Sequence, residues 1–199
     1  MIDPAFLRVI LQTGILISVA YASGSLVYYE GVKVNYTRKI NHFALFFVPM
    51  FLDNILPVEP SIESIIIVGF LAVGSLIIYI KPLRNKSRII QRMFLSFDRP
   101  EDRPNTLLWL STQITVGYLI LIPIMIYFFK LGYGALILIP ILVNGIGDGL
   151  AEPVGVRFGR IKYKTYALFS KIKYERTVEG SACVFFTSLI VIIFFHSSF

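Results

Sequence analysis

Six apolar segments separated by polar stretches constrain the fold of this chain more than any other feature of the sequence. They cover residues 9–29, 43–56, 62–80, 107–129, 134–154 and 181–196. A bilayer core about 30 Å thick is crossed by about 20 apolar residues in a helix. A mean hydropathy of +0.73 with 16% charged residues is also too apolar for a water-soluble domain. The sequence therefore predicts one all-α integral membrane domain, residues 1–199, with about six transmembrane helices.

The basic residues predict the orientation of these helices. All lysines and arginines except Arg8 and Lys130 lie in the stretches 30–42, 81–106 and 155–180. Positively charged loops stay on the cytoplasmic side during insertion. Because the three stretches follow the first, third and fifth segments, six spans place all of them in the cytoplasm and both termini opposite. Orientation alone is one explanation of the net charge of +7.

Several classes of protein are excluded by what the sequence lacks. Cys183 is the only cysteine, so neither a disulfide framework nor a Cys/His metal cluster is expected. No GxxxxGK[ST] loop, GxGxxG loop or protein-kinase motif set occurs. His42 and His196 are the only histidines, which gives a hydrolase triad little support. The first segment lacks a charged leader and a cleavage site, so we expect a retained helix.

The fifth segment contains NGIGDGLAEPVG, residues 144–155, a polar run where an apolar helix should continue. Asn144, Asp148 and Glu152 are spaced four apart, which places them on one face of a helix. Ionisable groups at membrane depth cost about 2.5–3.5 kcal/mol each on insertion scales and usually line a functional cavity. Glycines 145, 147 and 149 let the helix break or let another backbone or a phosphate come close, and Pro153 then blocks the normal helix ladder. We therefore expect a hydrophilic notch at the cytoplasmic end of helix five.

Bases follow these acids directly, in VRFGRIKYK and KIKYERTVEGS. A hard cation such as Mg²⁺ takes carboxylate and phosphate oxygens together, while lysine and arginine neutralise the remaining phosphate charge. The pattern predicts a nucleotide site and phosphoryl or nucleotidyl transfer at the membrane surface. The alternative is a kinked helix end whose acids cap the helix or pair with nearby arginines.

The run GDGLAEPVGVRFGRIKY followed by RTVEGS resembles the signature of the CTP-transferase-type membrane proteins. That group includes phosphatidate cytidylyltransferase and the CTP-dependent kinases of dolichol, phytol and fungal diacylglycerol. The resemblance is dense over residues 144–181, and TRKINHF is similar to an R-K-x-x-H element of many kinase members. One apolar segment follows Gly180, without the G-G-x-x-D-R-x-D signature of the cytidylyltransferases, which favours the kinase branch. Glu152 and Pro153 depart from the small residues common at those positions.

The resemblance implies roles for individual residues. Asp148 is the expected magnesium and phosphate ligand, Glu152 is an added metal and catalytic candidate, and Asn144 holds a ribose or phosphate oxygen. The basic residues expected at the triphosphate are Arg160 and Lys162, the latter also a catalytic candidate. The loop expected to close the nucleotide site consists of Arg176, Thr177, Glu179 and Gly180, where Glu179 binds metal or orients Arg176.

Two further groups of residues have either a role at the site or a purely structural role. Arg38, Lys39 and His42 are expected at the site by resemblance, but a basic cluster beside a span is also required for orientation. In SFDRPEDRPNTLLW, Arg99 or Arg103 could reach a phosphate. A salt-bridged turn that leads into span four, capped by Asn105 or Thr106, explains the same residues.

The resulting hypothesis is a CTP-dependent, Mg²⁺-requiring kinase of a membrane lipid alcohol: a polyprenol, phytol or diacylglycerol. Its expected partners are CTP, the lipid alcohol and the bilayer, with no nucleic acid. Asp148, Glu152 and His42 compete for the role of base. The alternatives are a nucleotidyltransferase that makes a CDP-lipid and a small transporter with an acidic cavity. The apolar surface does not specify the acceptor, the membrane or the oligomeric state.

Overall fold

The structure is a computed structural model that describes residues 4–58, 62–166 and 173–195. The chain divides into two compact units, Met1–Gly134 and Ala135–Phe199, and most of the described residues are helical, as the sequence predicts. Lys171 and His196 lie outside the described residues. The prediction of one membrane domain stays a prediction.

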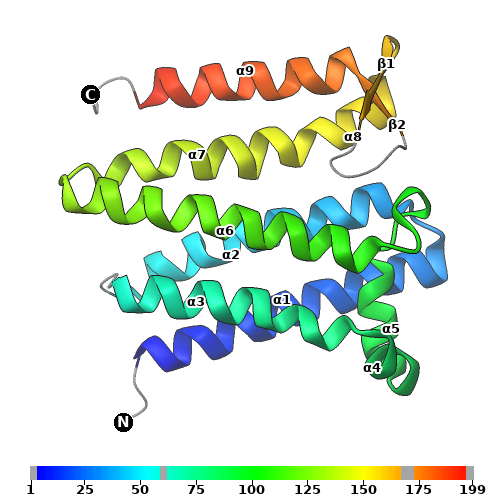
Figure 1. Ribbon diagram of the computed structural model, residues 1–199, viewed down its shortest axis with the longest axis horizontal. Coiled ribbons are helices and arrows are strands. Elements are labelled where there is room, and N and C mark those ends of the chain that lie inside the picture. The colour runs from blue at the N-terminus through cyan, green and yellow to red at the C-terminus, as the bar shows by residue number, and fades with distance from the viewer. Residues whose placement is uncertain (1–3, 59–61, 167–172, 196–199) are drawn as a thin grey trace. The chain divides into compact units, whose positions relative to one another are not determined.

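The described part of the first unit consists mainly of helices (Figure 1). Its elements are α1 (Pro4–Glu30), α2 (Val34–Ile55), α3 (Ile62–Ser75), η1 (Leu76–Tyr79), α4 (Lys81–Lys86), α5 (Arg88–Leu95), η2 (Pro100–Asp102) and α6 (Thr106–Lys130). Helix α1 packs against α2 and α5, and α3 packs against α6. Each predicted apolar segment of this unit falls within helical elements, except that Leu56 and Ile80 lie one residue beyond the helix ends.

Helix α2 differs from the predicted second span because it begins well before the apolar segment. Gly31, at φ +63°, provides the left-handed turn between α1 and α2, a conformation that favours glycine. The helix then starts at Val34, so the R-K-x-x-H residues belong to its first turns rather than to a loop. At its other end Asp53, the acid of the short second segment, forms an ion pair with Arg8 of α1.

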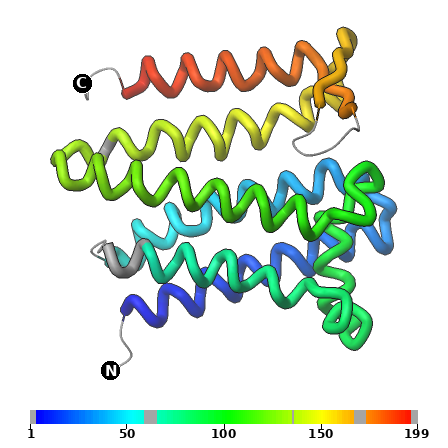
Figure 2. Tube along the Cα trace, viewed as in Figure 1, coloured from blue at the N-terminus to red at the C-terminus, as the bar shows by residue number. Residues whose placement is uncertain are grey.

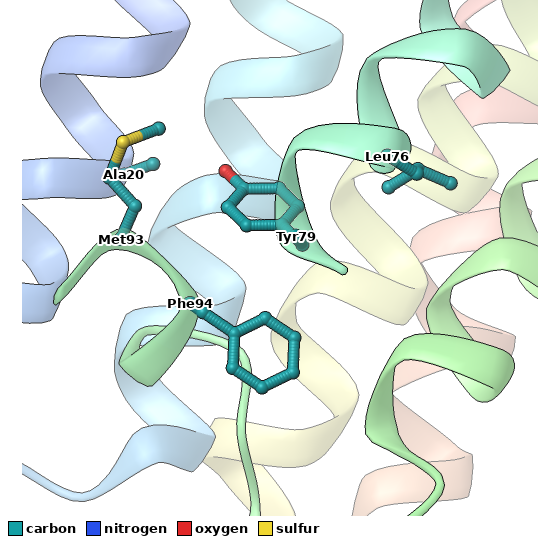
Figure 3. Close-up of a cluster of buried hydrophobic side chains, with 5 residues drawn as sticks. All are labelled: Ala20, Leu76, Tyr79, Met93 and Phe94. Atoms are coloured by element: carbon teal, nitrogen blue, oxygen red, sulfur yellow. The ribbon is translucent and has the colours of Figure 1, made fainter. Parts of the chain in front are cut away.

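The core of the first unit lies where α1, η1 and α5 meet. Figure 3 shows its five buried side chains, which are Ala20, Leu76, Tyr79, Met93 and Phe94. On α1 the buried residues Ala20, Ser23 and Gly24 are all small. At Gly24 a Cβ atom would collide with the backbone carbonyl of Arg92 in α5. Small residues on α1 thus allow direct contact between the two helix backbones.

Within the described ranges, two helices, α1 and α6, are long and apolar enough to cross a membrane. Only 6% of the apolar window of α1 and 0% of that of α6 is buried, whereas the core helix of a soluble protein is mostly buried. Two shorter apolar helical stretches, Ile66–Tyr79 and Val178–Phe194, also present large side chains outward, with Phe70 77% and Phe194 78% exposed. Exposed apolar surface on this scale is typical of a protein that contacts lipid.

The second unit contains η3 (Gly134–Ile137), whose first residue closes the first unit, then α7 (Leu138–Leu142), η4 (Val143–Asp148), α8 (Gly149–Phe158), β1 (Lys162–Tyr166), β2 (Lys173–Thr177) and α9 (Val178–Phe194). The predicted break in the polar run is wrong. The helix continues from Leu138 to Phe158, and η4 is a π-helical turn within it (Figure 2). Pro153 lies inside α8 without ending it.

The antiparallel hairpin β1–β2 also departs from the all-α prediction. It pairs Lys162 with Thr177 at its base and Tyr166 with Lys173 at its far end. Both strands are mostly exposed and rich in tyrosine, threonine and lysine. Aromatic and β-branched residues favour strands, and the apolar pattern that predicts spans carries no information about so polar a segment.

Candidate functional site

The polar helix face is present, but a π-helical turn carries it instead of a break. Asn144 and Asp148 lie in η4 and are exposed, and Glu152 is half-buried one turn later in α8. The Asn144 side-chain amide donates a hydrogen bond to the Pro140 carbonyl at 2.9 Å. Single π-helical turns occur frequently at functional sites. Two carboxylates and one amide therefore lie along a continuous helix.

The glycines of the signature bring α8 and α9 into close contact around Thr177. A Cβ atom at Gly155 would lie 2.7 Å from the Thr177 Oγ1, and one at Gly180 would lie 2.8 Å from the Ala151 carbonyl oxygen. At Gly159 a Cβ atom would collide with both the Gly155 carbonyl and the Thr177 side chain. Thr177 caps α9, because its Oγ1 accepts a hydrogen bond from the Gly180 N–H at 3.2 Å. Thr177 and Gly180 thus have a packing role between α8 and α9.

Glu179 holds the turn that connects α8 to the hairpin. Its carboxylate accepts hydrogen bonds from the Arg160 N–H at 2.8 Å and the Ile161 N–H at 3.2 Å. These backbone bonds, first of all the one from Arg160, hold the pKa of Glu179 below its ordinary value. The sequence assigned Glu179 to a metal or to Arg176, whereas these contacts fix the backbone that leads into the basic strand.

The register of the hairpin separates the predicted phosphate-binding residues. Lys162 pairs with Thr177 and Tyr163 pairs with Arg176, and side chains alternate between the two faces of a strand. Lys162 and Arg176 therefore belong to opposite faces. On one face the Lys162 Nζ lies 2.7 Å from the Glu175 Oε1, and both side chains are more than half exposed. On the other, the Tyr163 hydroxyl is 2.6 Å from the Ser181 Oγ.

The donors of the second unit fit a magnesium ion that arrives with a nucleotide. Among the described residues no group of three or more His, Cys, Asp or Glu side chains could hold a metal alone. Mg²⁺ commonly binds one or two carboxylates together with substrate phosphates and water, rather than an all-protein cage. Asp148 and Glu152 supply such a pair of carboxylates, four residues apart.

A second polar cluster lies entirely within the first unit. Asp102 of η2 accepts two hydrogen bonds from Arg99, at 2.7 and 3.0 Å, and its Oδ2 lies 3.6 Å from the Arg38 Nη1. Arg38 also donates a hydrogen bond to the Gln113 side chain at 3.3 Å. With Trp109, these residues line a cavity of ≈ 10 Å³, about the space of one water molecule. Arg99 and Asp102 are 8% and 6% exposed, so the ion pair is buried.

The loop before α6 is a salt-bridged turn, which is one of the two structures that the sequence predicts for SFDRPEDRPNTLLW. The Arg103 Nε donates a hydrogen bond to the Asp98 Oδ2 at 2.8 Å, and the Thr106 hydroxyl donates one to the Asp98 Oδ1 at 2.6 Å. Asn105 occupies the N-cap position of α6 without a side-chain cap hydrogen bond. The contact of Arg99 or Arg103 with a phosphate stays a prediction.

The remaining predicted residues lie on α2. Lys39 is 4% exposed, and the His42 ring lies 4.9 Å from the Phe46 ring, centroid to centroid. Two further carboxylates, Asp102 and Glu175, contact the bases around them and are not among the residues predicted from the sequence. The sequence features that could have indicated them are the DRPED pattern and the acid at the centre of KYERT.

No family model, curated protein or solved structure matches this chain.

Proposed function

We propose that the chain is a CTP-dependent kinase that phosphorylates the hydroxyl of a membrane lipid alcohol. The proposal rests on one observation in the second unit: a helix that bears Asp148 and Glu152 is followed directly by a basic hairpin. Helices α8 and α9, joined through glycines and Thr177, hold the two elements in one packed unit. Oxygen donors and bases together suit a magnesium nucleotide.

The apolar surface supports an acceptor that lies in the membrane, without specifying which lipid alcohol it is. Helices α1 and α6 expose apolar side chains along their lengths, and a six-span arrangement extends this to the other four apolar segments. In that arrangement the polar face of η4 and α8 lies at the cytoplasmic end of the fifth span. A nucleotide then enters from the cytoplasm while an alcohol headgroup approaches along the membrane.

The chemistry reduces to positioning and charge compensation. Asp148 and Glu152 would hold the magnesium ion that arrives with the nucleotide, and one of the two carboxylates would accept the proton of the acceptor hydroxyl. Lys162 and Arg160 compensate negative charge on the transferring phosphoryl group, with Lys162 exchanging Glu175 for the phosphate. Bound Mg²⁺ supplies electrostatic stabilisation of the phosphate oxygens.

The contacts change the roles expected for the loop before α9. Glu179, Thr177 and Gly180 act as positioning residues, because their contacts hold the backbone that carries Arg160 and Lys162. Arg176 belongs to the face opposite Lys162 and is left out of the phosphate contacts. Asn144 remains a candidate for a ribose or phosphate oxygen.

Product analysis tests the proposal. Purified protein is incubated with Mg²⁺, with CTP or ATP, and with a polyprenol, phytol or diacylglycerol, and the products are identified by mass. A kinase yields CDP and a lipid monophosphate. Pyrophosphate and a CDP-lipid would instead identify the nucleotidyltransferase. Solute flux without nucleotide consumption would identify the transporter, and either result would overturn the kinase.

Asp148→Asn tests the key carboxylate. We expect a loss of lipid phosphorylation of about 10²–10³-fold, as for the removal of a group that stabilises developing charge, with the thermal unfolding midpoint in detergent unchanged. Glu175→Gln, a carboxylate of the same unit assigned no catalytic role, is the matched control. Near-normal turnover by Asp148→Asn would refute the assignment.

A further inference from the structure

The basic segment between α3 and the Asp102 cluster is not used by the proposed reaction. It begins where the apolar run of α3 and η1 ends, with Pro82 in the first turn of α4. Residues 81–97 contain no acidic side chain. The basic residues of the segment are Lys81, Arg84, Lys86, Arg88 and Arg92. Helices α4 and α5 therefore carry a charge of one sign directly beside an apolar helix.

The fold presents part of this charge to the outside. Lys81, Lys86 and Arg88 are exposed, and none of them forms an ion pair with a residue that the structure describes. Helix α5 is held in place by its Met93 and Phe94 side chains, which are buried in the core of the first unit. The bases stand on a fixed surface rather than on a flexible tail.

Arg84 is the most strongly positioned of these bases. Its guanidinium carbon lies 3.8 Å from the centroid of the Phe94 ring, a cation–π contact with a core residue. Its Nε is buried and has no hydrogen-bond partner among the residues that the structure describes. Arg84 as a whole is half-buried, so this cation is held in place without being fully enclosed. Planar guanidinium groups match phosphate oxygens well.

Apolar side chains accompany the bases on the same segment. Leu83 is 36% exposed and Ile89 is 59% exposed. An exposed apolar side chain is unfavourable in water but is accommodated at the boundary between headgroups and acyl chains. By contrast, Arg92 is enclosed by tyrosines of α1, with its guanidinium carbon 4.6 Å from the Tyr28 ring and 4.8 Å from the Tyr29 ring, and serves to fasten α5 to α1.

We propose that Lys81–Leu95 is a binding surface for the phosphate headgroups of anionic phospholipids, with Arg84 as its fixed contact. Basic clusters immediately next to a transmembrane helix recognise such lipids. The occupant is a membrane lipid, because the bases adjoin the end of an apolar helix and are interspersed with exposed apolar side chains. The inference requires only that the apolar helices lie in a bilayer, so it stands whether or not the chain is a kinase.

Lipid retention tests this surface. The protein is reconstituted into bilayers of phosphatidylcholine and phosphatidylglycerol, extracted, and analysed by mass for the ratio of the two lipids that stay bound. We expect phosphatidylglycerol to be enriched over the bulk ratio and the enrichment to fall with added salt. Each lost base near the surface should lower it about fivefold. A bound ratio equal to the bulk ratio would overturn the proposal.

Three variants separate lipid binding from membrane orientation. Lys81→Gln combined with Arg88→Gln should lose most of the enrichment. Arg84→Lys keeps the charge that sets orientation but lacks the planar group over Phe94, and it should retain less phosphatidylglycerol than the wild type. Lys130→Gln, an exposed base at the end of α6, is the matched control and should behave as wild type. Equal enrichment in all variants, or equal loss in Lys130→Gln, would contradict the assignment.

Discussion

The two units each combine carboxylates with bases, but they do so in opposite ways. In the first, Asp102 lies between Arg99 and Arg38, is 6% exposed and makes a two-point contact with Arg99. In the second, Lys162 and Glu175 meet through one contact between side chains that are more than half exposed. The buried cluster is a fixed structural element, whereas the exposed pair exchanges partners at little cost.

This difference indicates where a ligand competes best. A nucleotide phosphate that displaces Glu175 from Lys162 gives up only a solvent-screened ion pair. A ligand that displaces Asp102 from Arg99 must leave a buried charge without its partner. We therefore propose the exposed hairpin rather than the Asp102 cluster as the phosphate site, whereas Asp102 holds the side chains of Arg99 and Arg38.

Breaking the buried cluster should have the largest effect. Asp102→Asn leaves Arg99 and Arg38 without their shared carboxylate, and we expect a loss of about 3–5 kcal/mol of stability, typical of an ion pair broken on one side. The thermal unfolding midpoint of the purified protein in detergent measures it. Asp98→Asn, in the less buried pair with Arg103, is the comparison and should cost less. Equal small losses would show that burial does not distinguish the pairs.

Removing the anchor of the hairpin should come next. Glu179→Ala deletes the acceptor of the Arg160 and Ile161 N–H groups, so we expect kcat/KM for CTP to fall by up to about 10²-fold through misplacement of Lys162. Hydrogen exchange at both amides should accelerate. Glu179→Gln keeps one acceptor oxygen and should lie between wild type and Ala. If Gln and Ala lose activity equally while exchange stays slow, Glu179 is a ligand instead of an anchor.

The same carboxylate predicts a pH dependence. The pKa of Glu179 is lower in the folded protein than its ordinary value of 4.5, so its contribution to stability is complete above pH 4.5. It is lost as the pH falls through the folded-state pKa. Between neutral and acidic pH the unfolding midpoint of the wild type should therefore drop further than that of Glu179→Gln. Parallel curves for the two proteins would contradict the assigned hydrogen bonds.

A smaller effect is expected where α8 meets the hairpin. In Gly159→Ala the new methyl group collides with a backbone carbonyl and with Thr177, which should cost about 1–3 kcal/mol, as overpacking does. Gly14→Ala, where a Cβ atom meets nothing within 4 Å, is the matched control and should leave the unfolding midpoint unchanged or slightly higher. Equal unfolding midpoints for the two variants would mean that Gly159 is not in close contact with Thr177, contrary to the structure.

The smallest effect belongs to the exposed pair. Glu175→Gln should change stability by about 0–1 kcal/mol, because solvent screens the ion pair with Lys162. Since Lys162 then no longer has to leave Glu175, the apparent KM for CTP should stay level or fall, and Lys162→Ala should raise it. A higher KM in Glu175→Gln would mean that Glu175 positions Lys162 for the nucleotide.

The sequence predicted the helical segments well because apolar runs of membrane length are a strong local signal. It failed where the outcome depends on partners. The glycines around Asp148 suggested a break, yet packing of Gly147 against Val184 and Thr187 of α9 accompanies a π-helical turn. The hairpin was missed because polar strands carry no apolar alternation. The role of Glu179 required the backbone positions of Arg160 and Ile161, which no spacing rule supplies.

The π-helical turn has a consequence for how this chain can vary. A residue removed from an α-helix rotates everything that follows by about 100° relative to what precedes it, since 3.6 residues make one turn. Deletion of a single glycine between Val143 and Asp148 would leave a regular helix but would rotate Asp148 and Glu152 by that angle relative to the residues before the turn. Length, more than composition, is therefore the property of this turn that natural variation must preserve.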